Sequence, residues 1–203
     1  MKIVAYLTLV FLSHGCVSES IESTIYIEDL NSWFTKNASN YIKTKEFDKV
    51  SISAKFMPNE FRISRGFLNH TSANNQEKFE SQLNELRGEY VFHVRIEGKS
   101  GVHPLKIKTN TSDYFGKLQH MSTDIKEQIL LVADQKDTTY CSMTHLERNY
   151  ETAPFLNLVA GFKGVPQAKK SLTLVYNDKI FGIGIINYLF EADEIHNIPK
   201  ILI

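Results

Sequence analysis

Five strand-like runs follow one another in the second half of the chain, with only short connections between them. They are expected at residues 125–134, 138–148, 155–163, 170–176 and 183–190. The segments ADQKDTT and YNDKIFG supply turn residues between some of these runs. Parallel neighbours in a sheet need long crossover connections, so connections this short imply antiparallel pairing. The second half of the chain therefore predicts an antiparallel sheet.

Two further runs in the first half alternate between apolar and polar residues with a period of two. They lie at 49–58 and 89–98 and predict strands with one solvated face. Residues 103–109 are expected to return beside the second run as a hairpin. These runs add to the predicted sheet.

Helices are expected at 27–36, at 75–88 and just after Ser112, because apolar residues there share one helical face. Residues 59–69 fit either a helix or a strand, and EADEIHN near the end of the chain fits a helical turn. The whole pattern predicts an α+β fold. We expect an antiparallel sheet or partial β-sandwich, with two or three short helices on one face.

Composition limits both the number of domains and the classes of partner. The chain has 203 residues, of which 42% are hydrophobic, and this suits a single folded domain, expected at 25–203. Lysine plus arginine equals aspartate plus glutamate, 23 against 23. Without a basic surface there is no electrostatic footprint for nucleic acid, so no nucleic-acid partner is expected.

The first 15 residues are predicted to form a signal peptide. Lys2 supplies a positive start, and residues 3–12 form an apolar run about half as long as the roughly 20 residues of a membrane-spanning helix. Ser13 and Gly15 are small residues that fit cleavage before Cys16. A lipoprotein signal would be cut at the same bond, although Leu12 lies one position further from the cysteine than the usual motif places it.

Cys16 is therefore the predicted lipidation site, with residues 16–24 as a polar tether. Diacylation would attach the chain firmly to membrane lipid, since each buried methylene contributes about 0.8 kcal/mol and two chains suffice. Cys141 is the other of the two cysteines. The alternatives are a soluble secreted or periplasmic protein that begins at an unmodified Cys16, or a disulfide between the two cysteines.

Two stretches in the carboxyl-terminal third carry a resemblance. They are THLERNYETAPFLNLVAGF and LTLVYNDKIFGIGIINYLFEADEIHNIPKI, and SISAKFMPNEF adds a weaker match. In these stretches the chain resembles small lipoproteins of Bacteroidetes-type bacteria that have no assigned activity. The resemblance implies a location in the cell envelope, on the periplasmic or the surface side of the outer membrane. It also implies a looser lipidation motif around Cys16, and it implies no chemistry.

The main candidate site in a predicted strand is the polar cluster of Cys141, His145, Glu147 and Arg148. Cys141 and His145 would lie about 13 Å apart along a strand, too far for one zinc ion. His145 and Glu147 share a face, but two ligands do not make a metal site. The favoured interpretation is therefore that a polar network, either between Glu147 and Arg148 or between strands, holds the end of this strand in place. No metal or cofactor is expected.

The segment FGIGII at 181–186 contains two glycines but follows no βαβ pattern, so a phosphate-binding loop is not favoured there. The function favoured by the sequence is a non-enzymatic envelope accessory or binding module. Its expected partner is another envelope protein or a glycan, and Trp33 is available for stacking. The alternative is an exported hydrolase that uses Cys141, His145 and Glu147, which requires these side chains to converge in a cleft.

Overall fold

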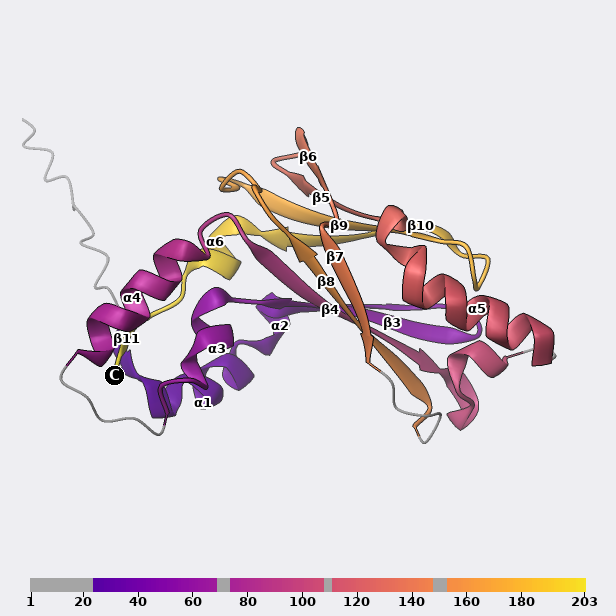
Figure 1. The fold of residues 1–203 in the computed structure, drawn as a ribbon, viewed down its shortest axis with the longest axis horizontal. Coiled ribbons are helices and arrows are strands. Elements are labelled where there is room, and N and C mark those ends of the chain that lie inside the picture. The colour runs from indigo at the N-terminus through magenta and orange to yellow at the C-terminus, as the bar shows by residue number, and fades with distance from the viewer. Residues whose placement is uncertain (1–23, 69–73, 108–110, 148–152) are drawn as a thin grey trace, which may run out of the picture.

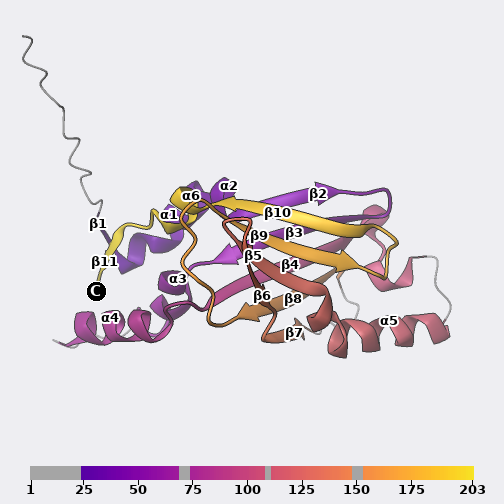
Figure 2. The same ribbon diagram turned by 90° about the horizontal axis from the view of Figure 1, so that it is seen from above.

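The computed structural model describes residues 24–68, 74–107, 111–147 and 153–203. Within them, two antiparallel sheets are stacked face to face (Figure 1). One sheet has the strand order β2 (Ile42–Glu46), β3 (Val50–Met57), β4 (Tyr90–Gly98), β8 (Phe155–Phe162) and β7 (Met143–Glu147). The other has the order β10 (Gly184–Glu191), β9 (Ser171–Asp178), β5 (Ile129–Ala133) and β6 (Asp137–Tyr140). Figure 2, seen from above, shows the four-stranded sheet lying over the other.

The main hydrophobic core fills the space between the sheets. Alternate residues of β3, β4, β5, β8, β9 and β10 point inward, as the period of two predicts, and are almost completely buried. Phe92 of β4 packs against Phe190 of β10 with ring centroids 5.4 Å apart. The Tyr188 hydroxyl donates a hydrogen bond of 2.9 Å to the carbonyl of Ile52. Aromatic packing and this polar contact together join the two sheets.

Helices lie mainly at the two ends of the sheets (Figure 1). Among the described residues they are α1 (Leu30–Lys36), α2 (Ala38–Tyr41), α3 (Asn59–Ser64), α4 (Asn75–Glu85), α5 (Thr111–Thr123) and α6 (Ala192–His196). Short 3-10 turns occur at η1 (Ile27–Asp29), η2 (Lys99–Gly101), η3 (Pro104–Lys106) and η4 (Ile125–Gln128). The predicted α+β class is confirmed. None of the helices in the described ranges combines the length and the apolar character needed to cross a bilayer.

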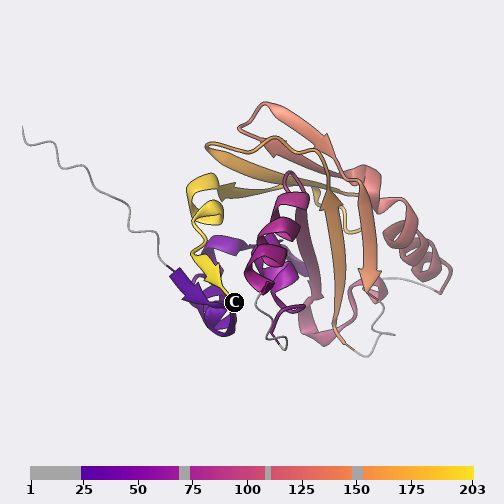
Figure 3. The same cartoon turned by 60° about the vertical axis from the view of Figure 1, so that its left-hand side comes forward.

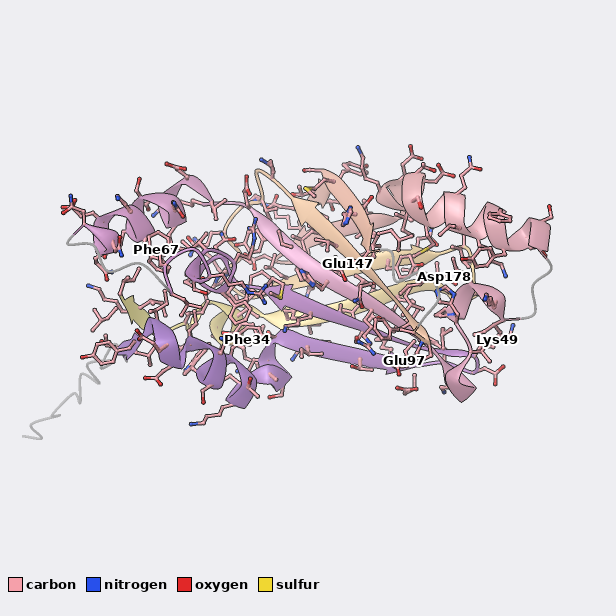
Figure 4. The ribbon with its side chains drawn as sticks, turned by 60° about the horizontal axis from the view of Figure 1, so that its bottom comes forward. Phe34, Lys49, Phe67, Glu97, Glu147 and Asp178 are labelled. Carbon is pink, nitrogen blue, oxygen red and sulfur yellow. The ribbon has the colours of Figure 1, made fainter. Side chains whose placement is uncertain are left out.

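A second, smaller core lies at the end of the molecule where the described chain begins and ends. It is formed by Ile27, Leu30, Phe67, Phe79 and Ile201. Strand β1 (Thr24–Tyr26) pairs there in parallel with β11 (Lys200–Leu202). We call this region, made of β1, α1, α3, α4 and β11, the end lobe (Figure 3; Phe67 is labelled in Figure 4).

Three details of the predicted strands are wrong. The run at 125–134 is a strand only from Ile129, because Ile125–Gln128 form the 3-10 turn η4. The run at 138–148 is two strands in different sheets, because the main-chain N–H of Cys141 donates to Ile129 while that of Ser142 donates to Gly161. The hairpin at 103–109 does not form, since β4 already has β3 and β8 on its two edges. The chain instead forms the 3-10 turn η3 there.

Candidate functional site

The polar cluster predicted around Cys141 is not assembled. The Cys141 side chain is buried, and its thiol donates to the carbonyls of Met143 and Gly161 at 3.1 and 3.5 Å. His145 and Glu147 are exposed on the outer face of the five-stranded sheet, which faces the viewer in Figure 4. No hydrogen bond or ion pair joins any two of these three residues, so the geometry gives the hydrolase alternative no support. Arg148 lies outside the described residues, as does Cys16.

Cys141 is expected to react slowly with thiol reagents. Burial raises the pKa of its thiol, which lowers the concentration of the reactive thiolate at neutral pH. Alkylation by iodoacetamide at pH 7 should therefore be far slower in the folded protein than in urea, as followed by mass spectrometry of the Cys141 peptide. Labelling of the folded protein at the rate of a free thiol would contradict the buried position.

The glycine-containing segment at 181–186 holds a carboxylate of its own chain. Both oxygens of buried Asp178 accept hydrogen bonds from the main-chain N–H groups of Ile180, Phe181 and Ile183, at 2.9 to 3.1 Å. Gly182 and Gly184 adopt positive φ angles of 76° and 82°, which glycine reaches without steric cost. Because these N–H groups are already bonded to Asp178, the loop is a structural turn.

One hollow lies where the sheets meet the end lobe. It has a volume of about 680 Å³, within the range of roughly 300–1,000 Å³ typical of small-molecule sites. The segments that line it come from β3, α3, the start of β4, the loop after β8, and α6. We call it the junction cleft, and the residues important below are Phe56, Glu60, Tyr90, Val165, Gln167 and His196.

Hydrogen bonds join the segments that form the walls of the junction cleft. The side-chain amide of Asn59 donates to the carbonyls of Leu86 and Glu89, which ties the start of α3 to the chain entering β4. The N–H of Val165 donates to the carbonyl of Gly88 at 3.0 Å. Gly88 has a φ of 77°, and a Cβ there would lie 3.3 Å from the Val165 carbonyl, so a glycine is needed at this crossing. These contacts join α3, the start of β4 and the loop after β8, which all line the cleft.

Glu60 is the unusual charged group of the cleft. It lies in the first turn of α3, and burial raises the pKa of its carboxyl above the ordinary value of 4.5. None of the ion pairs found among the described residues includes Glu60. A half-buried carboxylate without a cation is costly for a fold, and such groups are enriched at functional sites.

Aromatic residues also line the junction cleft. The rings of Phe56 and Tyr90 have centroids 5.8 Å apart, and the imidazole of His196 meets Tyr90 edge to face at 6.3 Å. Phe56 and Tyr90 are buried, whereas His196 lies at the exposed rim. Partial burial lowers the pKa of His196, so its ring is uncharged at neutral pH.

The cations near the cleft are already paired. Arg62 contacts Asn59 Oδ1 at 2.6 Å and Glu89 at 3.9 Å, and Lys163 contacts Glu89 at 2.8 Å. Arg87 donates to Asn84 Oδ1 at 3.2 Å. Glu89 is therefore neutralised by two cations, and Glu60 keeps a charge that the surrounding side chains do not compensate.

Replacing Glu60 by Gln is expected to raise the melting temperature at pH 7. In the folded state burial makes the carboxyl bind its proton more tightly than in the unfolded chain. The free energy of unfolding therefore falls as pH rises from about 4.5 through the raised pKa. At pH values above the raised pKa, the full loss of stability remains. Thermal unfolding of both proteins between pH 4 and 8 should show curves that converge at the acidic end. A destabilised variant at pH 7 would contradict the absence of a counter-ion.

A second hollow lies on the other side of α6. It has a volume of about 330 Å³ and is lined by Trp33, Asn37, Asn40, Asp193, Glu194 and Asn197. We call it the Trp33 hollow. Its lining combines one indole with amide and carboxylate groups, which offers both a stacking surface and hydrogen-bonding partners.

Sequence reasoning identified Trp33 but missed Glu60, which lies in the segment that fitted either a helix or a strand. Its partial burial depends on residues distant in sequence, and no local pattern signals it. In the part of the chain that the structure describes, no group of three or more His, Cys, Asp or Glu side chains is arranged to hold a metal ion.

Comparisons with known proteins add little about either hollow. No protein-family model matches the sequence, and no curated protein matches it. Among solved structures, a crystal structure titled as a novel protein of unknown function from Burkholderia pseudomallei K96243 aligns with 86% of this chain and 96% of that chain. The sequence identity is 9% and the TM-score is 0.35. The choice of a candidate site therefore depends on the geometry of this chain.

Proposed function

We propose that this chain is a non-enzymatic binding protein of the cell envelope and that the junction cleft is its ligand site. The observation that carries the proposal is the cleft itself, whose lining includes aromatic residues and the Glu60 carboxylate, a group outside any ion pair of the described residues. Such a combination of shape, apolar surface and a few polar groups is the usual composition of a small-molecule site. The separation of Cys141 from His145 and Glu147 favours binding over hydrolysis.

A fragment screen by ligand-observed NMR tests the cleft. Gln167 lines the cleft and is exposed, so Gln167→Trp should fill the cleft without disturbing the core. Gln119→Trp, at an exposed position of α5 outside the cleft, is the matched control. We expect fragments that bind the original protein and the Gln119→Trp variant, and that lose binding in Gln167→Trp. A screen whose ligands are all indifferent to Gln167→Trp would refute the cleft as the site.

The location in the envelope is a separate part of the proposal and rests on the leader, the tether and the resemblance to lipoproteins. Cys16→Ser should release the protein from the membrane fraction, and mass spectrometry of the original protein should show a diacylated Cys16. The same fractionation of Cys141→Ser, which should remain with the membrane, controls for loss of a cysteine in general. An unmodified Cys16 in the mature protein would contradict lipid attachment.

The Trp33 hollow supports a glycan as a second candidate ligand. Sugar rings pack their apolar faces on aromatic rings, and their hydroxyl groups bond to amides and carboxylates such as those of Asn37, Asn40 and Asp193. Trp33 is the single tryptophan of the chain, so its fluorescence reports on this hollow alone. Titration with maltotriose and chitotriose should shift the emission if the hollow holds a sugar, and unchanged emission would count against these glycans.

A further inference from the structure

We propose that the junction cleft recognises an organic ammonium group, with the Glu60 carboxylate as its counter-ion and the rings of Phe56 and Tyr90 as its apolar wall. This inference rests on the proposed function, because it names the chemical class of ligand for the same cleft. A positive partner stabilises a carboxylate that is held partly out of water, and no ion pair of the described residues includes Glu60.

The neighbouring charges leave room for an external cation. Arg62 and Lys163 both lie against Glu89, while Arg87 is directed to Asn84. His196, the remaining basic residue of the lining, is uncharged at neutral pH. A cation bound beside Glu60 would therefore meet a carboxylate that takes part in no ion pair of the described residues, and would displace no existing ion pair.

The aromatic wall favours an organic ammonium over a bare metal ion. The negative face of an aromatic ring attracts a desolvated cation, and a carboxylate next to aromatic rings is a common arrangement for alkylated ammonium groups. The Phe56 and Tyr90 rings lie within 5.8 Å of each other, and His196 extends the wall to the rim. A metal ion would instead require several oxygen or nitrogen ligands. Among the described residues, no such group of acidic, histidine and cysteine side chains is assembled.

The volume of the cleft also constrains the ligand. About 680 Å³ is much more than a lone ammonium group needs, so the group is expected to be the head of a larger molecule. Pro166 and Ile198 supply further apolar lining, and Gln167 a polar contact, for the remainder of such a molecule. The structure thus assigns an ammonium head to the Glu60 end and leaves the rest of the cleft for its tail.

Choline and its uncharged carbon analogue, 3,3-dimethylbutan-1-ol, test the charge requirement because they have nearly the same shape. Binding to the purified full chain is measured by ligand-observed NMR and by the shift of the His196 ring signals. We expect choline to bind at least tenfold more tightly than the analogue. Glu60→Gln should remove that preference, whereas Glu85→Gln, the same charge change at an exposed position of α4, should leave it intact.

The outcomes separate this inference from the proposed function. A choline preference that depends on Glu60 and disappears in Gln167→Trp supports the ammonium site. Equal binding of both probes that is lost only in Gln167→Trp would overturn the ammonium inference and leave the cleft as a binding site. Absence of choline binding would overturn the inference as well, and the fragment screen with Gln167→Trp would then decide the proposed function independently.

Discussion

Replacing Phe92 by Ala is expected to lower the free energy of unfolding by about 3–5 kcal/mol. The ring is fully buried in β4, at the centre of the space between the two sheets. It packs against Phe56 and Phe190 at 5.4 Å and against Phe162 at 5.9 Å, so its neighbours come from both sheets. Aromatic rings packed on several sides cannot collapse into the space that Ala leaves, and the cavity adds to the lost transfer free energy.

Urea unfolding followed by circular dichroism measures this loss. Folded domains are stable by only about 5–15 kcal/mol, so the variant should unfold at a much lower urea concentration or fail to accumulate. Phe115→Ala is the matched control, because Phe115 is 61% exposed on α5 and its truncation should change stability by no more than about 0.5 kcal/mol. Equal effects of the two substitutions would contradict the arrangement of the core.

Replacing Asp178 by Asn is expected to cost about 2–4 kcal/mol. The carboxylate is 4% exposed and accepts bonds from three main-chain N–H groups, those of Ile180, Phe181 and Ile183. The Tyr176 hydroxyl lies 3.4 Å from the same carboxylate. Asparagine offers one oxygen and turns an NH₂ group toward partly buried donors, so at least one N–H would lose its acceptor where water replaces it only poorly.

Asp134→Asn provides the matched control for Asp178→Asn. Asp134 also accepts bonds from three main-chain N–H groups, those of Lys169, Lys170 and Ser171. Asparagine tolerates its φ of 52°, so the substitution adds little backbone strain. The contacts to Lys169 and Lys170 are exposed, so water can replace them and the loss of stability should be smaller. Thermal unfolding of the two variants compares them, and a larger loss for Asp134→Asn would be inconsistent with burial as the cause.

The strands with clean alternation were predictable because their burial pattern is a property of the local sequence. Residues 49–58 and 89–98 correspond to β3 and β4, which pair directly with each other. Strand β2 was missed because Lys43, Lys45 and Glu46 give it no apolar face. It is an exposed edge strand, held by its main-chain bonds to β3. Pairing of this kind depends on the backbone of the neighbouring strand, so the sequence of β2 alone does not predict it.

The break between β6 and β7 illustrates a different limit. The residues from 138 to 148 look locally like one strand, and no proline or glycine interrupts them. The chain changes sheets at Cys141 because its neighbours there are Ile129 on one side and Gly161 on the other. Which partners are available is decided by the topology of the whole chain.

The candidate cleft was less predictable than the fold. The predicted polar residues His145 and Glu147 lie on an exposed sheet face, where their sequence pattern alone could not distinguish a solvated surface from a site. Glu60 lines the junction cleft together with residues far away in the sequence, including Tyr90, Val165 and Ile195. A single acidic residue after a proline gives no hint of that environment.

The pairing of β1 with β11 also bears on the order in which the molecule assembles. Thr24 and Lys200 are neighbours in space but are separated by nearly the whole described chain, so closing that loop carries a large entropic cost. The pair is expected to form late, after the sandwich has brought the two ends together. A chain that emerges from the ribosome with its N-terminus first would hold Ile27 and Leu30 without their partner Ile201 until that residue emerges. Completion of the small core would thus mark the end of folding.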